Sequence, residues 1–75
     1  MVAVKQIGQW TFTWKAENNW YECKGPITYD DEHDEIPAPD LWKAAMKLEQ
    51  SLLAQDYKAS AHYSEKGWVE VMIIN

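Results

Sequence analysis

Residues 40–55 read DLWKAAMKLEQSLLAQ, and they carry the clearest helical period in the chain. The apolar residues of this stretch recur every three to four positions, as in a helix that buries one face. Asp40, as the cap or in the first turn after Pro39, suits the positive end of such a helix. Glu49 falls inside the apolar arc that Trp42 and Leu53 widen. The predicted core stripe consists of Leu41, Ala44, Ala45, Leu48 and Leu52.

On the N-terminal side, residues 2–16 alternate between apolar and polar as one long strand, or as two strands with a kink at Gly8. The even-numbered apolar residues are predicted to share one face: Val2, Val4, Trp10, Phe12, Trp14 and Ala16. Asn18 and Asn19 suit a two-residue turn, which would place Trp14 opposite Cys23 and end the hairpin before Gly25.

After the helix, a second hairpin is predicted, with strands over residues 57–63 and 68–74. Glu65, Lys66 and Gly67 suit its turn, with Gly67 in the left-handed conformation, and the register places His62 opposite Glu70. The sum is an α+β fold of order ββαββ: an antiparallel sheet of about four strands with one helix packed on one face. The chain of 75 residues forms a single small domain.

An acidic segment lies within residues 26–39, which are predicted to form a loop. Neighbouring like charges repel, so this loop should be exposed and should present a dense negative field. An EF-hand does not fit, because its sixth position is Glu35 rather than Gly and its twelfth is Leu41 rather than Glu. The alternative is a loop that serves solubility only. Five of the chain's twelve acids form the segment: Asp30, Asp31, Glu32, Asp34 and Glu35.

Composition restricts the function. The net charge is −5, with seven lysines and no arginine, which argues against direct binding to nucleic acids or anionic lipid. No run approaches the ~20 apolar residues that span a bilayer. The single cysteine, Cys23, favours a reducing compartment, and we expect a soluble cytoplasmic protein. No cofactor, metal or nucleotide motif is present, and the pair of His62 and Glu70 has no nucleophile beside it, so we expect no enzyme.

Trp20 and Trp68 are predicted to face away from the core, each just after a turn, with Met72 and Ile74 beside Trp68. Aromatic residues and methionine are enriched in the cores of protein interfaces. The sheet's outer face is therefore a predicted binding surface. The alternative is that the acidic loop folds over this face and covers it.

These features together predict a small inhibitor that works by occupying a basic surface of a protein partner. Its predicted partner-binding residues are Asp30, Asp31, Glu32, Asp34, Glu35, Trp20, Trp68 and Met72. In size, acidity and lack of catalytic motifs, the chain resembles phage-encoded viral proteins that inhibit host nucleic-acid-handling or defence complexes, including anti-CRISPR and anti-restriction proteins. The alternative is a structural or regulatory homodimer, joined through the outer face, whose acidic loop is only solubilising.

Overall fold

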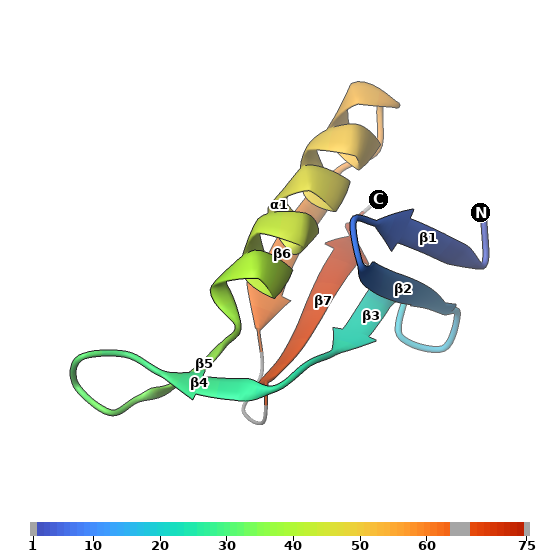
Figure 1. Cartoon of the computed structure of the whole chain (residues 1–75). Coiled ribbons are helices and arrows are strands. Elements are labelled where there is room, and N and C mark those ends of the chain that lie inside the picture. The colour runs from blue at the N-terminus through green and yellow to red at the C-terminus, as the bar shows by residue number, and fades with distance from the viewer. Residues whose placement is uncertain (1, 64–66, 75) are drawn as a thin grey trace.

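The computed structural model describes residues 2–63 and 67–74. One helix, α1 (Pro39–Ala54), crosses one face of a five-stranded antiparallel sheet, as Figure 1 shows. The predicted α+β class is confirmed, although the sheet has more strands than the four expected. In spatial order the strands are β1 (Val4–Ile7), β2 (Trp10–Lys15), β3 (Trp20–Lys24), β7 (Trp68–Ile73) and β6 (Ala59–Tyr63). A separate two-stranded hairpin consists of β4 (Ile27–Tyr29) and β5 (Glu35–Pro37).

Helix α1 agrees with its prediction to within one residue at each end. Pro39 and Asp40 lie in its first turn, where a missing N–H costs nothing and a negative charge is favourable. All five residues of the predicted stripe are buried. They share the core with six residues of the sheet's inner face: Phe12, Tyr21, Cys23, Val69, Val71 and Ile73.

The extra strand comes from the N-terminal segment, which reverses completely instead of kinking. Gly8, with a φ of 59°, and Gln9 form a two-residue turn, so that Ile7 pairs with Trp10 and Val4 with Thr13. Paired residues share a face, and a two-residue turn pairs odd positions with even ones. The prediction that Val4 shares a face with Phe12 is therefore wrong. Val4 lies on the outer face and is 49% exposed.

The turn between β2 and β3 has four residues rather than the predicted two. Asn18 N donates to Lys15 O at 3.1 Å, and Asn19 adopts a φ of 59°. Trp14 therefore pairs with Tyr21 instead of Cys23. Because the register moves by two residues, every side chain of β2 and β3 stays on its predicted face.

The C-terminal hairpin has the predicted register, with His62 opposite Glu70. Gly67 has a φ of 77°, the left-handed conformation expected for it, whereas Glu65 and Lys66 lie outside the described residues. β7 also pairs with β3, which joins the two hairpins into one sheet. No helix in the described part of the chain is both long and apolar enough to cross a membrane.

Candidate protein-binding surfaces

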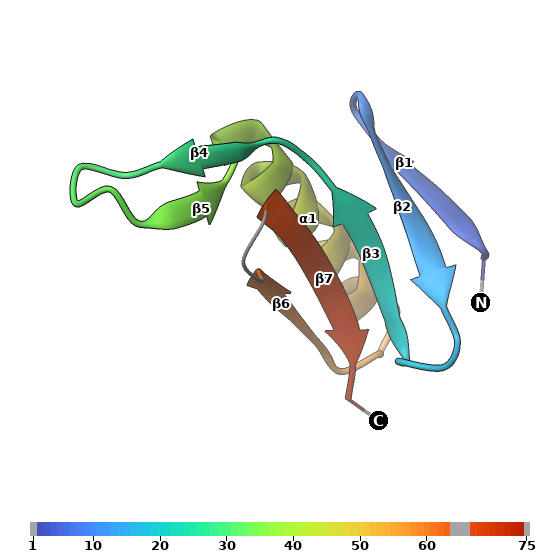
Figure 2. The same cartoon turned by 90° about the horizontal axis from the view of Figure 1, so that it is seen from below.

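The acidic segment is an ordered hairpin that extends beyond the end of the main sheet (Figures 1 and 2). The expectation of a loop throughout residues 26–39 is corrected here, because β4 and β5 pair within it. Thr28 Oγ1 lies 3.2 Å from both Ile36 O and Pro37 O, which helps to join the two strands. Pro37 is tolerated because β5 pairs only with β4, so its missing N–H interrupts no second ladder.

Asp30 builds the turn that carries the other acids. Its Oδ1 accepts hydrogen bonds from the backbone N–H groups of Glu32 and Asp34, both at 2.9 Å. The Asp30 N–H donates to Asp34 O at 3.1 Å, and His33 closes the turn with a φ of 63°. A carboxylate that accepts local backbone donors in this way is a common turn-forming device. Asp30 therefore shapes the turn, while the other four acids are available to a partner.

The charge of this hairpin is exposed. All five acids and His33 lie at the surface. No lysine lies within residues 25–42, so His33 is the only basic side chain among these acids in the sequence. With so little positive charge nearby in the sequence, the turn presents a concentrated negative potential at one end of the long axis of the molecule.

The outer face of the main sheet carries the second group of predicted residues. Trp20 and Met72 are direct cross-strand partners on β3 and β7, and Lys15 flanks Trp20 on β2. All three side chains are half-buried. The Trp20 Nε1–H is inaccessible to solvent and has no acceptor among the described residues. Trp20 and Met72 thus form a small apolar patch at one end of the face.

Trp68 lies on the same face but at the other end. It pairs with Lys24, whose Nζ sits 4.0 Å from the centroid of the Trp68 ring, a cation–π contact. The pair of Glu22 and Glu70 separates this row from the row of Trp20. Met72 thus lies beside Trp20 and not, as the sequence predicts, beside Trp68, so the predicted sheet residues share a face without forming one cluster.

The carboxylate row between the two tryptophans is electrostatically unfavourable. Glu22 and Glu70 are opposite each other, and like charges in that position destabilise a sheet. Burial raises the pKa of Glu70 above its ordinary value, the charge of Glu22 raises it further, and His62 on the other side opposes both effects.

Cys23, on the inner face, is a free buried thiol whose pKa is raised mainly by burial. A buried thiol of raised pKa is a poor nucleophile.

The alternative, that the acidic segment folds over the outer face and covers it, is not what the structure shows. Figure 2 shows the sheet in front of the helix, with the acidic hairpin extending from its end rather than across it. The face is hollowed over β2 and β3, with a volume of about 440 Å³. Thr11, Thr13, Lys15, Glu22 and Lys24 are among the residues that line this hollow. In the described part of the chain, the outer face is therefore open.

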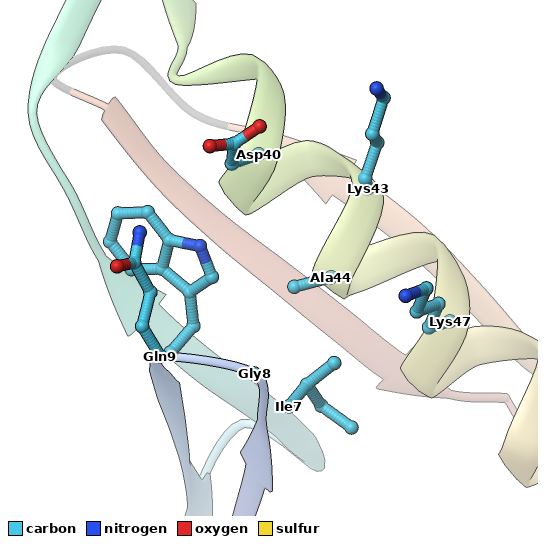
Figure 3. Close-up of a pocket in the computed structure, with 8 residues that line it drawn as sticks. Ile7, Gly8, Gln9, Asp40, Lys43, Ala44 and Lys47 are labelled. Atoms are coloured by element: carbon cyan, nitrogen blue, oxygen red, sulfur yellow. The ribbon is translucent and has the colours of Figure 1, made fainter.

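A second hollow lies between the β1–β2 turn and the helix, where Figure 3 shows its lining. Its volume is about 380 Å³. Asp40 and Lys47 contribute opposite charges to it, and Lys43 extends away from the β1–β2 turn. These groups do not converge on one point, so we assign no ligand to this hollow.

An apolar groove beside the acidic hairpin was not predicted from the sequence. It lies where β5, the start of α1 and the end of β6 meet, and its volume is about 240 Å³. Trp42 and Tyr63 pack edge to face in it, with ring centroids 5.5 Å apart. The available signal was Trp42, which extends the helical apolar arc beyond the core stripe. The lining residues are Ile36, Pro37, Pro39, Trp42 and Tyr63.

Comparisons with protein-family models, curated proteins and solved structures find no match to this chain. The described residues also contain no group of three or more His, Cys, Asp or Glu side chains arranged to hold a metal ion. The function is therefore argued from the acidic hairpin, the outer face and the groove.

Proposed function

We propose that this chain is a protein-binding module that docks its acidic hairpin on a basic surface of a partner protein. The proposal rests on one observation: the exposed acids lie on a turn of defined conformation. Asp30 fixes the turn through two hydrogen bonds of 2.9 Å, and β4 and β5 hold it beyond the end of the sheet. A charged element that is already ordered loses less conformational entropy on binding than a disordered loop would.

The charge distribution favours a protein partner over a nucleic acid. Phosphate groups would be repelled by the hairpin, and the net charge of −5 adds to that repulsion. A surface rich in lysine and arginine is attracted instead, and long-range attraction raises the rate of association. Complexes that handle nucleic acids bind their substrates on surfaces that are rich in lysine and arginine. Inhibition of such a complex, in the manner of anti-CRISPR or anti-restriction proteins and within the cytoplasm, is the specific role we propose.

The test is capture of partners from a bacterial lysate by three immobilised forms of the chain. The first is the wild type, and the second carries Asp31→Asn, Glu32→Gln and Asp34→Asn at the hairpin tip. The third is a control in which exposed acids elsewhere are neutralised: Glu17→Gln, Asp40→Asn and Asp56→Asn. Both variants lower the negative charge by the same amount, and both leave Asp30 to shape the turn.

We expect the wild type and the control variant to capture the same protein, and the hairpin variant to lose it. Moderate salt should release that protein, because attraction between exposed charges is screened over about 8 Å at physiological ionic strength. Equal capture by the two variants would show that the location of the charge does not matter and would contradict the proposal.

A homodimer joined through the outer face is the second candidate. The observation in its favour is the open patch of Trp20 and Met72, together with the nearby Ile74, which is 57% exposed. Sedimentation velocity over a range of concentrations distinguishes the two candidates. A dimer that Trp20→Ala dissociates would favour the second, and a monomer at all concentrations would exclude it.

A further inference from the structure

We propose that the apolar groove beside the hairpin receives one aliphatic or aromatic side chain from the same basic protein segment that pairs with the acidic turn. This inference rests on the proposed function and specifies the partner: a lysine- or arginine-rich segment with a single apolar anchor residue. The groove and the turn would then bind adjacent parts of one segment.

The size and chemistry of the groove fit one side chain. Its volume of about 240 Å³ falls below the roughly 300–1,000 Å³ of small-molecule sites. Its lining consists of two prolines, two aromatic rings and Ile36, with no charged side chain. Tyr63 remains 53% exposed at the rim, so an inserted side chain would cover a ring that now faces solvent. Anchors seated in such apolar pockets often dominate the affinity of protein interfaces.

The groove is preformed because backbone restraints hold one wall and a contact between two rings forms the other. Pro37 and Pro39 have restricted φ angles, and Thr28 bonds to the β5 carbonyl groups. Trp42 is held against Tyr63 with an interplanar angle of 86°. A groove that is already shaped has little ordering cost to offset when a partner binds.

The position of the charges selects a basic occupant. Glu35 directly precedes Ile36 of the groove in the sequence. Asp34 and the rest of the acidic turn come directly before Glu35. Residues that flank an inserted anchor would therefore lie in this negative field, which attracts lysine or arginine and repels acids. A second copy of this chain is a poor occupant, because it would bring a net charge of −5 to an acidic site.

Two synthetic peptides test the proposal: Lys-Lys-Leu-Lys-Lys and Lys-Lys-Ser-Lys-Lys, each titrated into the ¹⁵N-labelled chain and followed by NMR. Both should shift the amide signals of residues 30–35. Only the leucine peptide should also shift those of Ile36, Ala38, Trp42 and Tyr63. It should bind about tenfold more tightly, as expected for partial burial of a leucine side chain.

Three variants test the location of the anchor. Tyr63→Ala should reduce the affinity for the leucine peptide to that for the serine peptide, whereas Tyr63→Phe, which keeps the ring, should not. Leu53→Ala removes an exposed apolar side chain, 43% accessible, from the last turns of α1, the helix that also carries Trp42. This control should not change the affinity for either peptide.

The other outcomes overturn the proposal. Equal affinity of the two peptides, with shifts confined to residues 30–35, would refute the groove and leave the proposed function intact. Leucine-specific shifts at Trp20 and Met72 would place the anchor on the outer face instead. The absence of any shift at residues 30–35 with either peptide would contradict the proposed function and the groove together.

Discussion

The Ala61 N–H on strand β6 donates a hydrogen bond of 2.7 Å to Glu49 Oε2 on the helix. β6 is the last strand of the sheet, so alternate N–H groups along it have no neighbouring strand. The carboxylate of Glu49 occupies one of these edge positions. This contact explains why an acid falls within the apolar arc of the helix, and it protects the edge from pairing with another chain.

Replacing Glu49 should therefore weaken the fold and expose the edge. Glu49→Ala should lower the free energy of unfolding by about 1–3 kcal/mol, because it leaves a partly buried donor unpaired. Glu49→Gln keeps an oxygen acceptor and should lower the free energy of unfolding by less than Glu49→Ala does. Urea unfolding measures both variants, and size-exclusion chromatography should show more self-association for the alanine variant. Identical stability of all three proteins would mean that the contact contributes nothing.

The close approach of two loops depends on a glycine. A Cβ on Gly67 would lie 2.5 Å from Gly25 O, and the φ of 77° is itself strained for any other residue. Gly8 has a similar φ of 59°, but a Cβ there would meet nothing within 4 Å. Gly8→Ala should thus cost only the backbone strain, roughly 1–2 kcal/mol. In urea unfolding, Gly67→Ala should lower the free energy of unfolding distinctly more than Gly8→Ala does. Equal losses for the two variants would show that the new Cβ does not clash with Gly25 O.

The raised pKa of Glu70 predicts a pH-dependent stability. Burial, and then Glu22, make the folded state bind this proton more tightly than the unfolded state does. The resulting stabilisation is complete below the ordinary pKa of 4.5 and is lost as the pH rises through the folded value. Glu70→Gln should therefore be more stable than the wild type at pH 7, and this difference should shrink as the pH falls toward 4.5.

Thermal unfolding of the wild type, Glu70→Gln and Glu17→Gln across this pH range provides the check. Glu17 is an exposed residue of the turn between β2 and β3, so its variant controls for the loss of one negative charge. A Glu70→Gln effect of constant size from pH 4 to pH 7 would contradict the assigned cause.

Local patterns predicted the helix and the C-terminal hairpin because each depends on nearby residues. The buried stripe from Leu41 to Leu52 can be recognised from the helical spacing of apolar residues alone. The pairing of His62 with Glu70 follows from the short turn that joins their strands. The pairing of β3 with β7 brings together segments that are distant in sequence, which no local pattern determines. The groove of Trp42 and Tyr63 depends on the same long-range arrangement and was missed for that reason.

The errors near the N-terminus and in the acidic segment came from turns with weak signals. Gly8 and Gln9 lack the Asn-Gly or Asp-Gly pair that marks two-residue hairpins, so the sequence predicts one long strand or a kink there instead of a reversal. The acidic segment is predicted to be an exposed loop because its charges repel. It is closed instead by Asp30, whose position before a tight turn is a recognised turn-forming signal.

Association kinetics give the sharpest test of whether the charges of the acidic hairpin guide docking on a basic protein surface. Once the captured partner is purified, stopped-flow rates should be measured across a salt series for the wild type and the two charge-matched variants. Neutralising Asp31, Glu32 and Asp34 should slow association more than it speeds dissociation and should flatten the salt dependence. The control variant should behave like the wild type. Equal association rates and equal salt slopes for the two variants would mean that the charges of the hairpin do not guide docking.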